Sequence, residues 1–256
     1  MTGGWTTRHG LRYWLLSYRR MLHYDLVSQR QWLPFLFVIQ LLLSSGMAVL
    51  YGFYLPAISP RIAAFIVTGT PALALIPIGF VSVPSVIADQ KTAGTYDYVR
   101  SFPVPRMAAV ASATTVFTLL ALPGLMVALM LAAWRYGVDV TISPLIVPAV
   151  ALTSVTATCV GAALGHAIRN PMVTNLVSNL MIFFTLLFSP IVFPPDQFPN
   201  WLVQIHEWLP FYPMATVLRD ALSNGLVTGV GHAYAVLGAW TIVSLALTAR
   251  VVAHRR

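Results

Sequence analysis

Six long stretches without a charged residue constrain this chain more than any other feature of its sequence. Each runs for more than two dozen residues without Asp, Glu, Lys or Arg, and together they cover 31–60, 62–88, 107–134, 140–168, 170–195 and 221–249. A helix of ~20 apolar residues crosses the ~30 Å hydrocarbon core of a bilayer, so each stretch is long enough to span one. The sequence therefore predicts an all-α integral membrane protein with six transmembrane helices.

The composition supports the same prediction, because 58% of the residues are hydrophobic and only 9% are charged. So few charges cannot solvate a globule of this size in water. Six spans and their connections use up most of the 256 residues, so we expect a single transmembrane domain over 1–256. Its spans are predicted near 33–55, 62–87, 107–134, 142–168, 172–193 and 232–252.

The distribution of positive charge predicts the orientation of these spans. If the N-terminus is cytoplasmic, 12 Lys and Arg residues fall on the inner side, and three, Arg61, Arg135 and Arg219, fall on the outer side. This split follows the positive-inside rule, so both termini are predicted to face the cytoplasm. The net charge of +8 then reflects topology and attraction to anionic lipid headgroups. We expect no nucleic-acid partner.

Residues 8–30 have the pattern of a basic amphipathic helix. Apolar and aromatic residues recur at helical spacing from Leu11 to Leu26, while the arginines fall mainly on other sides of the helix. Such a helix lies in the interface of a membrane, here on the inner side. Simple anchoring to the membrane surface and contact with a cytoplasmic partner are equally good interpretations of it.

No motif for nucleotide, metal or nucleophilic chemistry occurs in the chain. The only lysine is Lys91, and Ser85 and Gln90 stand where a phosphate-binding loop needs glycine. His206-Glu207 lacks the second histidine of a zinc helix, and the single cysteine belongs to no Cys/His cluster. We therefore expect no catalytic residue, no metal and no cofactor in this chain. Any energy source must come from another polypeptide.

The predicted spans contain polar side chains but essentially no ionisable ones. Ion-coupled carriers keep ionisable groups near the bilayer centre, so a secondary carrier is the least favoured class of transporter. His166 and His232 lie at span ends, where an interfacial position is favoured over a proton relay. Most uncharged polar residues in spans form hydrogen bonds between helices, and a few can line a transport route. The candidates for such a route are Gln40, Ser44, Asn175 and Asn179.

The inward loop at 88–106 is longer and more charged than a simple connector needs. Gly94 and Thr95 predict a turn and a helix cap, and residues 96–100 predict a short helix that Pro103 stops. A solvated connector is the alternative interpretation, but it leaves the three aromatic rings of this loop in water. We therefore predict a rigid cytoplasmic knob.

The run Gly94-Thr95-Tyr96-Asp97, followed by Pro103-Val104, resembles the cytoplasmic loop of ABC-2 type transporter permeases, the membrane subunits of ATP-binding-cassette exporters. In that family the segment forms a coupling helix that inserts into a groove of a separate ATPase subunit. The resemblance implies that an ATPase docks here, on Asp89, Lys91, Gly94, Thr95, Tyr96, Asp97, Arg100 and Pro103.

A second resemblance lies at 194–228, which carries Phe198-Pro199, Trp208-Leu209-Pro210 and Tyr212-Pro213. In members of the family this outer segment folds as short helices that dip back into the outer leaflet. Interfacial aromatics and proline-broken half-helices fit the same description. We expect re-entrant outer half-helices between the fifth and sixth spans.

Membership of the family implies two permease subunits, identical or paralogous, and two ATPases that bind ATP and Mg, in the inner membrane of a bacterial cell. The size and loop pattern are most similar to drug and small-lipid exporters of the daunorubicin-resistance and nodulation-factor type. The expected substrate is an amphipathic drug-like or lipid-like compound that leaves the cell. A polysaccharide or glycolipid exporter has the same plan, and a non-transporting membrane scaffold is the alternative from another class.

Overall fold

The computed structural model describes residues 10–31, 33–54, 58–223 and 225–254, and within these ranges its regular structure is entirely helical. The elements in chain order are α1 (Leu11–Gln29), α2 (Leu33–Tyr54), α3 (Pro60–Pro77), the π-helical turn η1 (Ile78–Ser82), α4 (Val83–Thr92), α5 (Tyr96–Arg100), α6 (Arg106–Tyr136), α7 (Ile146–Ala167), α8 (Pro171–Phe188), the 3-10 turn η2 (Pro195–Gln197), α9 (Asn200–Trp208), α10 (Phe211–Leu222) and α11 (Val230–His254).

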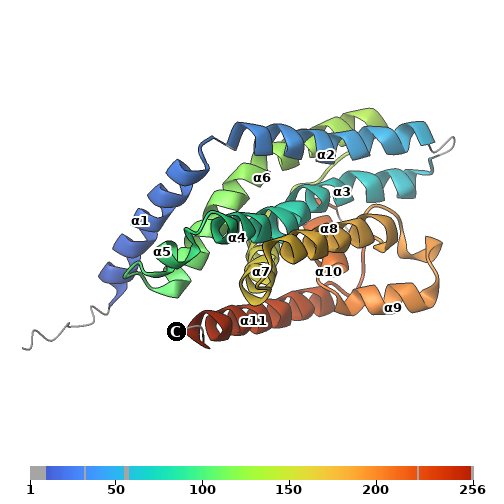
Figure 1. Ribbon diagram of the computed structural model, residues 1–256. Coiled ribbons are helices and arrows are strands. Elements are labelled where there is room, and N and C mark those ends of the chain that lie inside the picture. Colours follow the sequence, from blue (N-terminus) through green and yellow to red (C-terminus); the bar gives the residue numbers. More distant parts are fainter. Residues whose placement is uncertain (1–9, 32, 55–57, 224, 255–256) are drawn as a thin grey trace, which may run out of the picture.

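Six helical segments of the described chain are long and apolar enough to cross a membrane, which confirms the prediction. They are Pro34–Phe53, Pro60–Thr92, Arg106–Tyr136, Ile146–Ala167, Pro171–Phe188 and Val230–Arg250. In Figure 1 they form one bundle, with α1, α5 and the last turns of α11 at one end and α9 at the other. We call these the α5 end and the α9 end. The protein is therefore an all-α, multi-pass membrane protein.

The second span is an unbroken helical rod in which α3, η1 and α4 follow one another from Pro60 to Thr92. Its 33 residues make it about 50 Å long at the rise of an α-helix, well beyond the ~30 Å of a hydrocarbon core. The helix therefore continues beyond the predicted end of the span at residue 87, because a charged residue such as Asp89 can end a span without ending its helix. The first residues of the predicted loop at 88–106 are helical.

The fifth span ends earlier than predicted. α8 stops at Phe188, not near residue 193, and a bend at Ser189–Pro190 follows it. The residue before a proline favours an extended conformation, and Ser189 has ψ of 137°, so the helix ends before Pro190. The chain then passes through η2 at the α9 end.

The segment predicted at 194–228 folds into two short helices, α9 and α10. α10 packs against α3, α7 and α11, and nearly all of its residues are buried (Figure 1). α9 instead exposes Trp201 and Trp208. Re-entry of these helices into the outer leaflet stays a prediction, and residue 224 lies outside the described residues.

Glycines allow α7 to approach η1 and α4 backbone to backbone. A Cβ atom on Gly161 would overlap the carbonyl oxygen of Gly79, and one on Gly165 would lie 2.8 Å from Cδ1 of Ile87. Small residues at such spacing let membrane helices pack closely. The Gly161-xxx-Gly165 pair is therefore part of the contact between two spans of the same chain.

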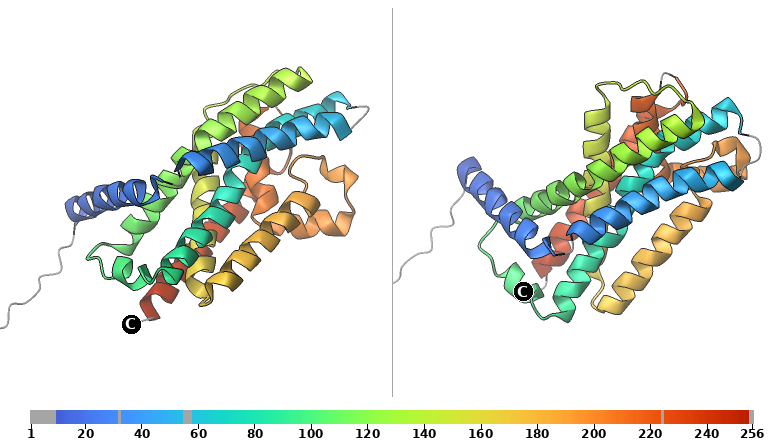
Figure 2. Two further views of the ribbon diagram at one scale, coloured as in Figure 1. Left: turned by 45° about the horizontal axis from the view of Figure 1, so that its top comes forward. Right: turned by 90° about the horizontal axis from the view of Figure 1, so that it is seen from above.

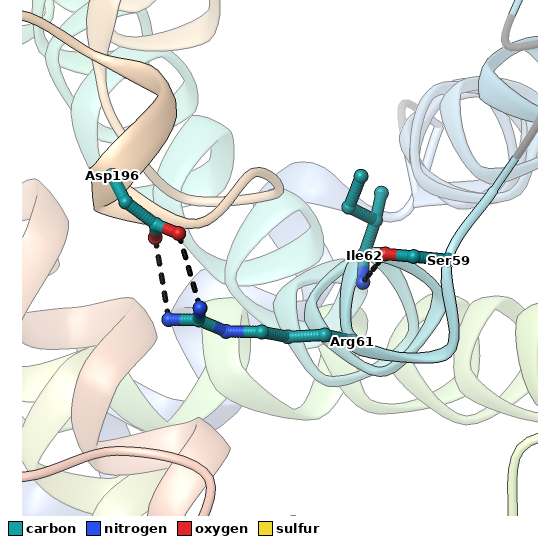
Figure 3. A network of polar contacts seen from close by, with 4 residues as sticks. All are labelled: Ser59, Arg61, Ile62 and Asp196. Atoms are coloured by element: carbon teal, nitrogen blue, oxygen red, sulfur yellow. Dashed lines mark hydrogen bonds and ion pairs between the residues drawn. The ribbon is translucent and has the colours of Figure 1, made fainter.

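One ion pair ties the start of α3 to η2 at the α9 end (Figure 3). The guanidinium of Arg61 donates to both carboxylate oxygens of Asp196, at 3.0 and 3.3 Å. Both side chains are more than half exposed, so the pair contributes at most about 1 kcal/mol. Next to it, the Ser59 hydroxyl accepts the Ile62 N–H at 3.3 Å and caps α3.

The close approach of α7 predicts a large effect for a single methyl group. Gly161→Ala is expected to lower the free energy of unfolding by about 1–3 kcal/mol, because the overlapping atom belongs to a backbone that cannot move aside cheaply. The matched control is Gly238→Ala in α11, where no atom lies within 4 Å of the added Cβ and stability changes by at most about 1 kcal/mol. Thermal unfolding in detergent measures both, and equal midpoints for the two variants contradict this packing.

Candidate functional site

The predicted knob is present as α5 and the turn that joins it to α4. Gly94 has φ of +71°, a conformation that glycine adopts at little cost, and it reverses the chain at the end of the rod. The predicted helix at 96–100 is confirmed by α5. The predicted cap is wrong in one detail, because the Thr95 hydroxyl makes no capping bond and lies 3.4 Å from the carbonyl oxygen of Gln90 instead.

Lys91 fastens the end of the rod to α7. Its ammonium donates to the backbone carbonyls of Gly165 and Ile168, the latter at 2.6 Å, and lies 5.2 Å from the ring centroid of Tyr96. The last carbonyls of a helix have no partner within the helix, and a cation there is favoured by the helix dipole. This predicted docking residue therefore holds two spans together.

Tyr96 makes a second attachment to the same helix. It is only 9% exposed, and its hydroxyl is hydrogen-bonded to Nδ1 of His166 at 2.8 Å, with the two rings 5.7 Å apart. The first residue of α5 is thus fixed against the last turn of α7. His166, which the sequence suggested was a simple interfacial residue, is the partner that positions it.

The other predicted docking residues surround this anchor. The side chains of Asp89, Thr95, Asp97 and Pro103 are exposed, and Gly94 lies between them. Arg100 is the last residue of α5, and the structure does not describe its side chain. Tyr98 is one of the three aromatic residues that the sequence placed in the knob, although it was not among the predicted docking residues, and it is 65% exposed on the same helix.

α1 braces the knob from the other side (Figure 2). It packs along α6, and the Tyr18 hydroxyl is hydrogen-bonded to Thr115 Oγ1 at 2.9 Å. Tyr13 donates to the carbonyl of Pro103, and the Tyr24 ring meets Phe102 edge-on at 5.4 Å. The predicted amphipathic helix at 8–30 is therefore observed from Leu11 to Gln29, and residues 8 and 9 lie outside the described residues.

A partly buried acid, Asp25, lies in the contact between α1 and α6. The Ser112 hydroxyl donates to the carboxylate of Asp25. Burial raises the pKa of Asp25 to about 6 from its usual 3.8, and the hydrogen bond from Ser112 opposes that shift only in part. The protonation of this carboxyl group therefore changes close to neutral pH.

A cavity of about 240 Å³ lies further along the bundle, between α2, the middle of the second span, α6 and α8. Ile39 and Phe183, both more than half exposed, form its open side between α2 and α8. Apart from three polar residues its walls are apolar. The lining residues are Leu36, Ile39, Gln40, Leu43, Pro77, Ile78, Val81, Ser82, Phe117, Leu120, Asn179, Ile182, Phe183 and Leu186.

The structure brings together two of the four residues predicted for a transport route. Gln40 and Asn179 line the same cavity from α2 and α8. Ser44 is buried instead, and its hydroxyl lies 2.7 Å from the carbonyl of Gln40 in the same helix and 3.4 Å from that of Gly124 in α6. Asn175 accepts a hydrogen bond from Ser85 at 3.0 Å and joins α8 to α4. Sequence spacing could not separate these roles, because all four are uncharged polar residues in apolar helices.

Arg219 is the residue whose position the sequence reasoning missed. It was counted among the outer-side charges, but it is fully buried in α10. Its guanidinium donates to Thr68 Oγ1 at 3.1 Å and to the carbonyls of Phe65 and Ile191, and it lies 4.2 Å from the Phe65 ring centroid. A Cβ on Gly69 would overlap the same Ile191 carbonyl. Arg219 thus ties the chain after α8 to the second span.

The sequence matches the family model described as ABC-2 family transporter protein over residues 53–250. The chain belongs to the ABC-2 transporter family. No individual curated protein matches it. The matched part of this ABC-2 chain contains the knob, Arg219 and three of the four walls of the cavity, so the protein is a multi-pass membrane component of a transporter.

The attachment of the rod to α7 predicts that Lys91 stabilises the fold. Lys91→Met keeps most of the side-chain volume but leaves the α7 carbonyls without their donor, so the free energy of unfolding should fall by about 1–3 kcal/mol. Arg169→Met removes an exposed cation at the same end and serves as the control. Thermal unfolding in detergent measures both, and an equal loss in the two variants contradicts the assignment.

Asp25 predicts a dependence of stability on pH. Its pKa is raised in the folded chain, so its contribution is fully present below about pH 4 and is lost as the pH rises through about 6. From pH 5 to 7.5 the wild type should lose about 1 kcal/mol of stability relative to Asp25→Asn. Thermal unfolding at both pH values measures this difference, and a constant gap between the two proteins refutes the prediction.

Proposed function

We propose that this ABC-2 protein is the permease subunit of an ATP-binding-cassette exporter, which moves an amphipathic compound out of the cell with ATP hydrolysed by a separate subunit. One observation carries the proposal: a single helical rod connects the cavity to the knob. Residues Pro77, Ile78, Val81 and Ser82 of the rod line the cavity, and the same rod ends at Thr92, next to α5.

The knob has the features of a docking surface for an ATPase that binds ATP and Mg. In this proposal the α5 end faces the cytoplasm, where such a subunit resides. The exposed side chains of Asp89, Asp97 and Tyr98 supply charge and an aromatic ring for recognition. Lys91 and Tyr96 supply rigidity, because both are bound to α7. A movement of the ATPase against α5 is therefore passed to two spans at once.

The π-helical turn η1 is a point at which the rod can bend in response to that movement. η1 lies between Pro77 and Pro84, where the regular hydrogen-bonding ladder of the rod is interrupted, and π-turns often occur at functional sites. Three of its residues, Ile78, Val81 and Ser82, line the cavity. A tilt of α4 about this turn changes the shape of the cavity. This supports alternation between inward and outward openings.

The open side of the cavity supports a second permease, identical or paralogous. Ile39 on α2 and Phe183 on α8 are 58% and 60% exposed beside the cavity mouth. A second subunit over these two helices would enclose a route between the permeases, while lipid covers the remaining apolar faces. The apolar walls favour an amphipathic substrate over a polysaccharide, which would need polar groups along its whole path. A membrane scaffold has no need of such a cavity.

The docking test changes two exposed side chains of the knob. Asp97→Arg combined with Tyr98→Ala should abolish co-purification of the ATPase and lower substrate-stimulated ATP hydrolysis at least about tenfold, since interface anchors of this kind contribute about 2 kcal/mol or more. Asp139→Arg makes the same charge reversal on an exposed residue outside the knob, in the connection that follows α6, and should have no effect. Unchanged assembly together with unchanged ATP hydrolysis in the double variant refutes the docking site.

A further inference from the structure

The cavity has no charged wall. Eleven of its 14 lining residues are apolar, and the other three are Gln40, Ser82 and Asn179. Moving an unpaired anion from water into such surroundings is costly, because no cationic side chain of the wall can compensate its charge. At about 240 Å³ the cavity is also smaller than the ~300–1,000 Å³ of a pocket that holds a whole drug-sized ligand. It therefore fits the polar head of an amphiphile and the carbons next to it.

Gln40 presents an acceptor to this cavity. Its side-chain nitrogen donates to the carbonyl of Ala74 on α3. A carbonyl oxygen can only accept, so this bond fixes which end of the Gln40 amide is the nitrogen. Oε1 has no hydrogen-bond partner among the described residues, and it is not completely buried. Because Gln40 lines the cavity, we take this accessible oxygen to face it.

Asn179 repeats this arrangement from the opposite wall. Its Nδ2 donates to the backbone carbonyl of Asn175 at 2.8 Å, one turn earlier in α8. The side chain is exposed, and its Oδ1 has no hydrogen-bond partner in the described part of the chain, so it remains an acceptor beside the cavity. The Ser82 hydroxyl, which can donate or accept, completes the polar groups. Two lining residues thus each keep an amide oxygen that can accept a hydrogen bond from a group in the cavity.

The aromatic residues of the wall reinforce the same preference. Phe117 and Phe183 line the cavity, and the faces of aromatic rings attract cations. Carbonyl oxygens and ring faces both favour a group that is electropositive at its surface. An N–H or O–H donor meets these conditions, and a carboxylate or phosphate does not.

We propose that this cavity selects amphiphiles whose head donates hydrogen bonds, an amine or a hydroxyl, and rejects anionic heads. The proposal names the substrate class of the exporter and rests on the proposed function for its role in transport. The selectivity itself belongs to the cavity and can be measured on the permease without hydrolysis of ATP. Failure of the two proposals is therefore distinguishable.

The test places a reactive thiol in the wall. In a Cys159→Ser background, Ser82→Cys is labelled with a maleimide in lipid nanodiscs, and decylamine, decanol and decanoate are compared as protecting probes. The amine and the alcohol should protect at concentrations at least about tenfold lower than the carboxylate, the equivalent of ~1.4 kcal/mol of head-group preference. Adding Asn179→Leu removes one acceptor and should reduce this difference to less than about threefold.

A second thiol controls for partition of the probes into lipid. Gln204→Cys introduces it on an exposed residue of α9, away from the cavity, where no probe should protect. Equal protection of the two thiols, equal or better protection by decanoate, or a preference that survives Asn179→Leu overturns the proposal. If the selectivity is found but no ATPase assembles with the chain, the proposed function fails and this inference stands.

Discussion

The contact of α7 with η1 and α4, the second part of the second span, is the constraint on which the rest of the structure depends. Gly161 and Gly165 let the two backbones meet at η1 and α4, and Lys91 then closes the end of α7 with its ammonium group. Because this contact involves backbone atoms, neither helix can rotate or slide without losing packing. It fixes the cavity on one side of the rod and the knob at its end.

A second set of contacts fixes the two ends of the molecule relative to this core. At the α5 end, α1 binds the knob through Tyr13 and Tyr24. At the other side of the core, buried Arg219 draws the chain after α8 onto α3. Burying a guanidinium is costly unless its donors find partners, and here a hydroxyl and two backbone carbonyls accept from Nε and Nη2, while Nη1 is buried without a hydrogen-bond partner. The cavity therefore lies between the region fixed by α1 and the region fixed by Arg219. The second span connects these regions, and its helical hydrogen-bonding pattern changes at η1.

The arrangement separates recognition of an energy source from recognition of a ligand. In the function proposed here, charged and aromatic groups of the knob contact the ATPase, while uncharged carbonyl oxygens and phenyl rings contact the substrate. The two sites share the rod and no side chain. This explains why polar residues of similar type, such as Asn175 and Asn179, have different roles: one joins helices, and the other faces the cavity.

The sequence alone determined the class of fold, because long charge-free stretches can satisfy their backbone in lipid only as helices. It also determined the short helix of the knob, since glycine, proline and helical spacing act locally. The tertiary structure decided where each helix ends, that Lys91 and Tyr96 anchor the knob, that Arg219 is buried, and that Gln40 and Asn179 share a cavity. These facts depend on contacts between residues tens of positions apart, and a side chain's type and spacing do not specify which distant backbone it will meet.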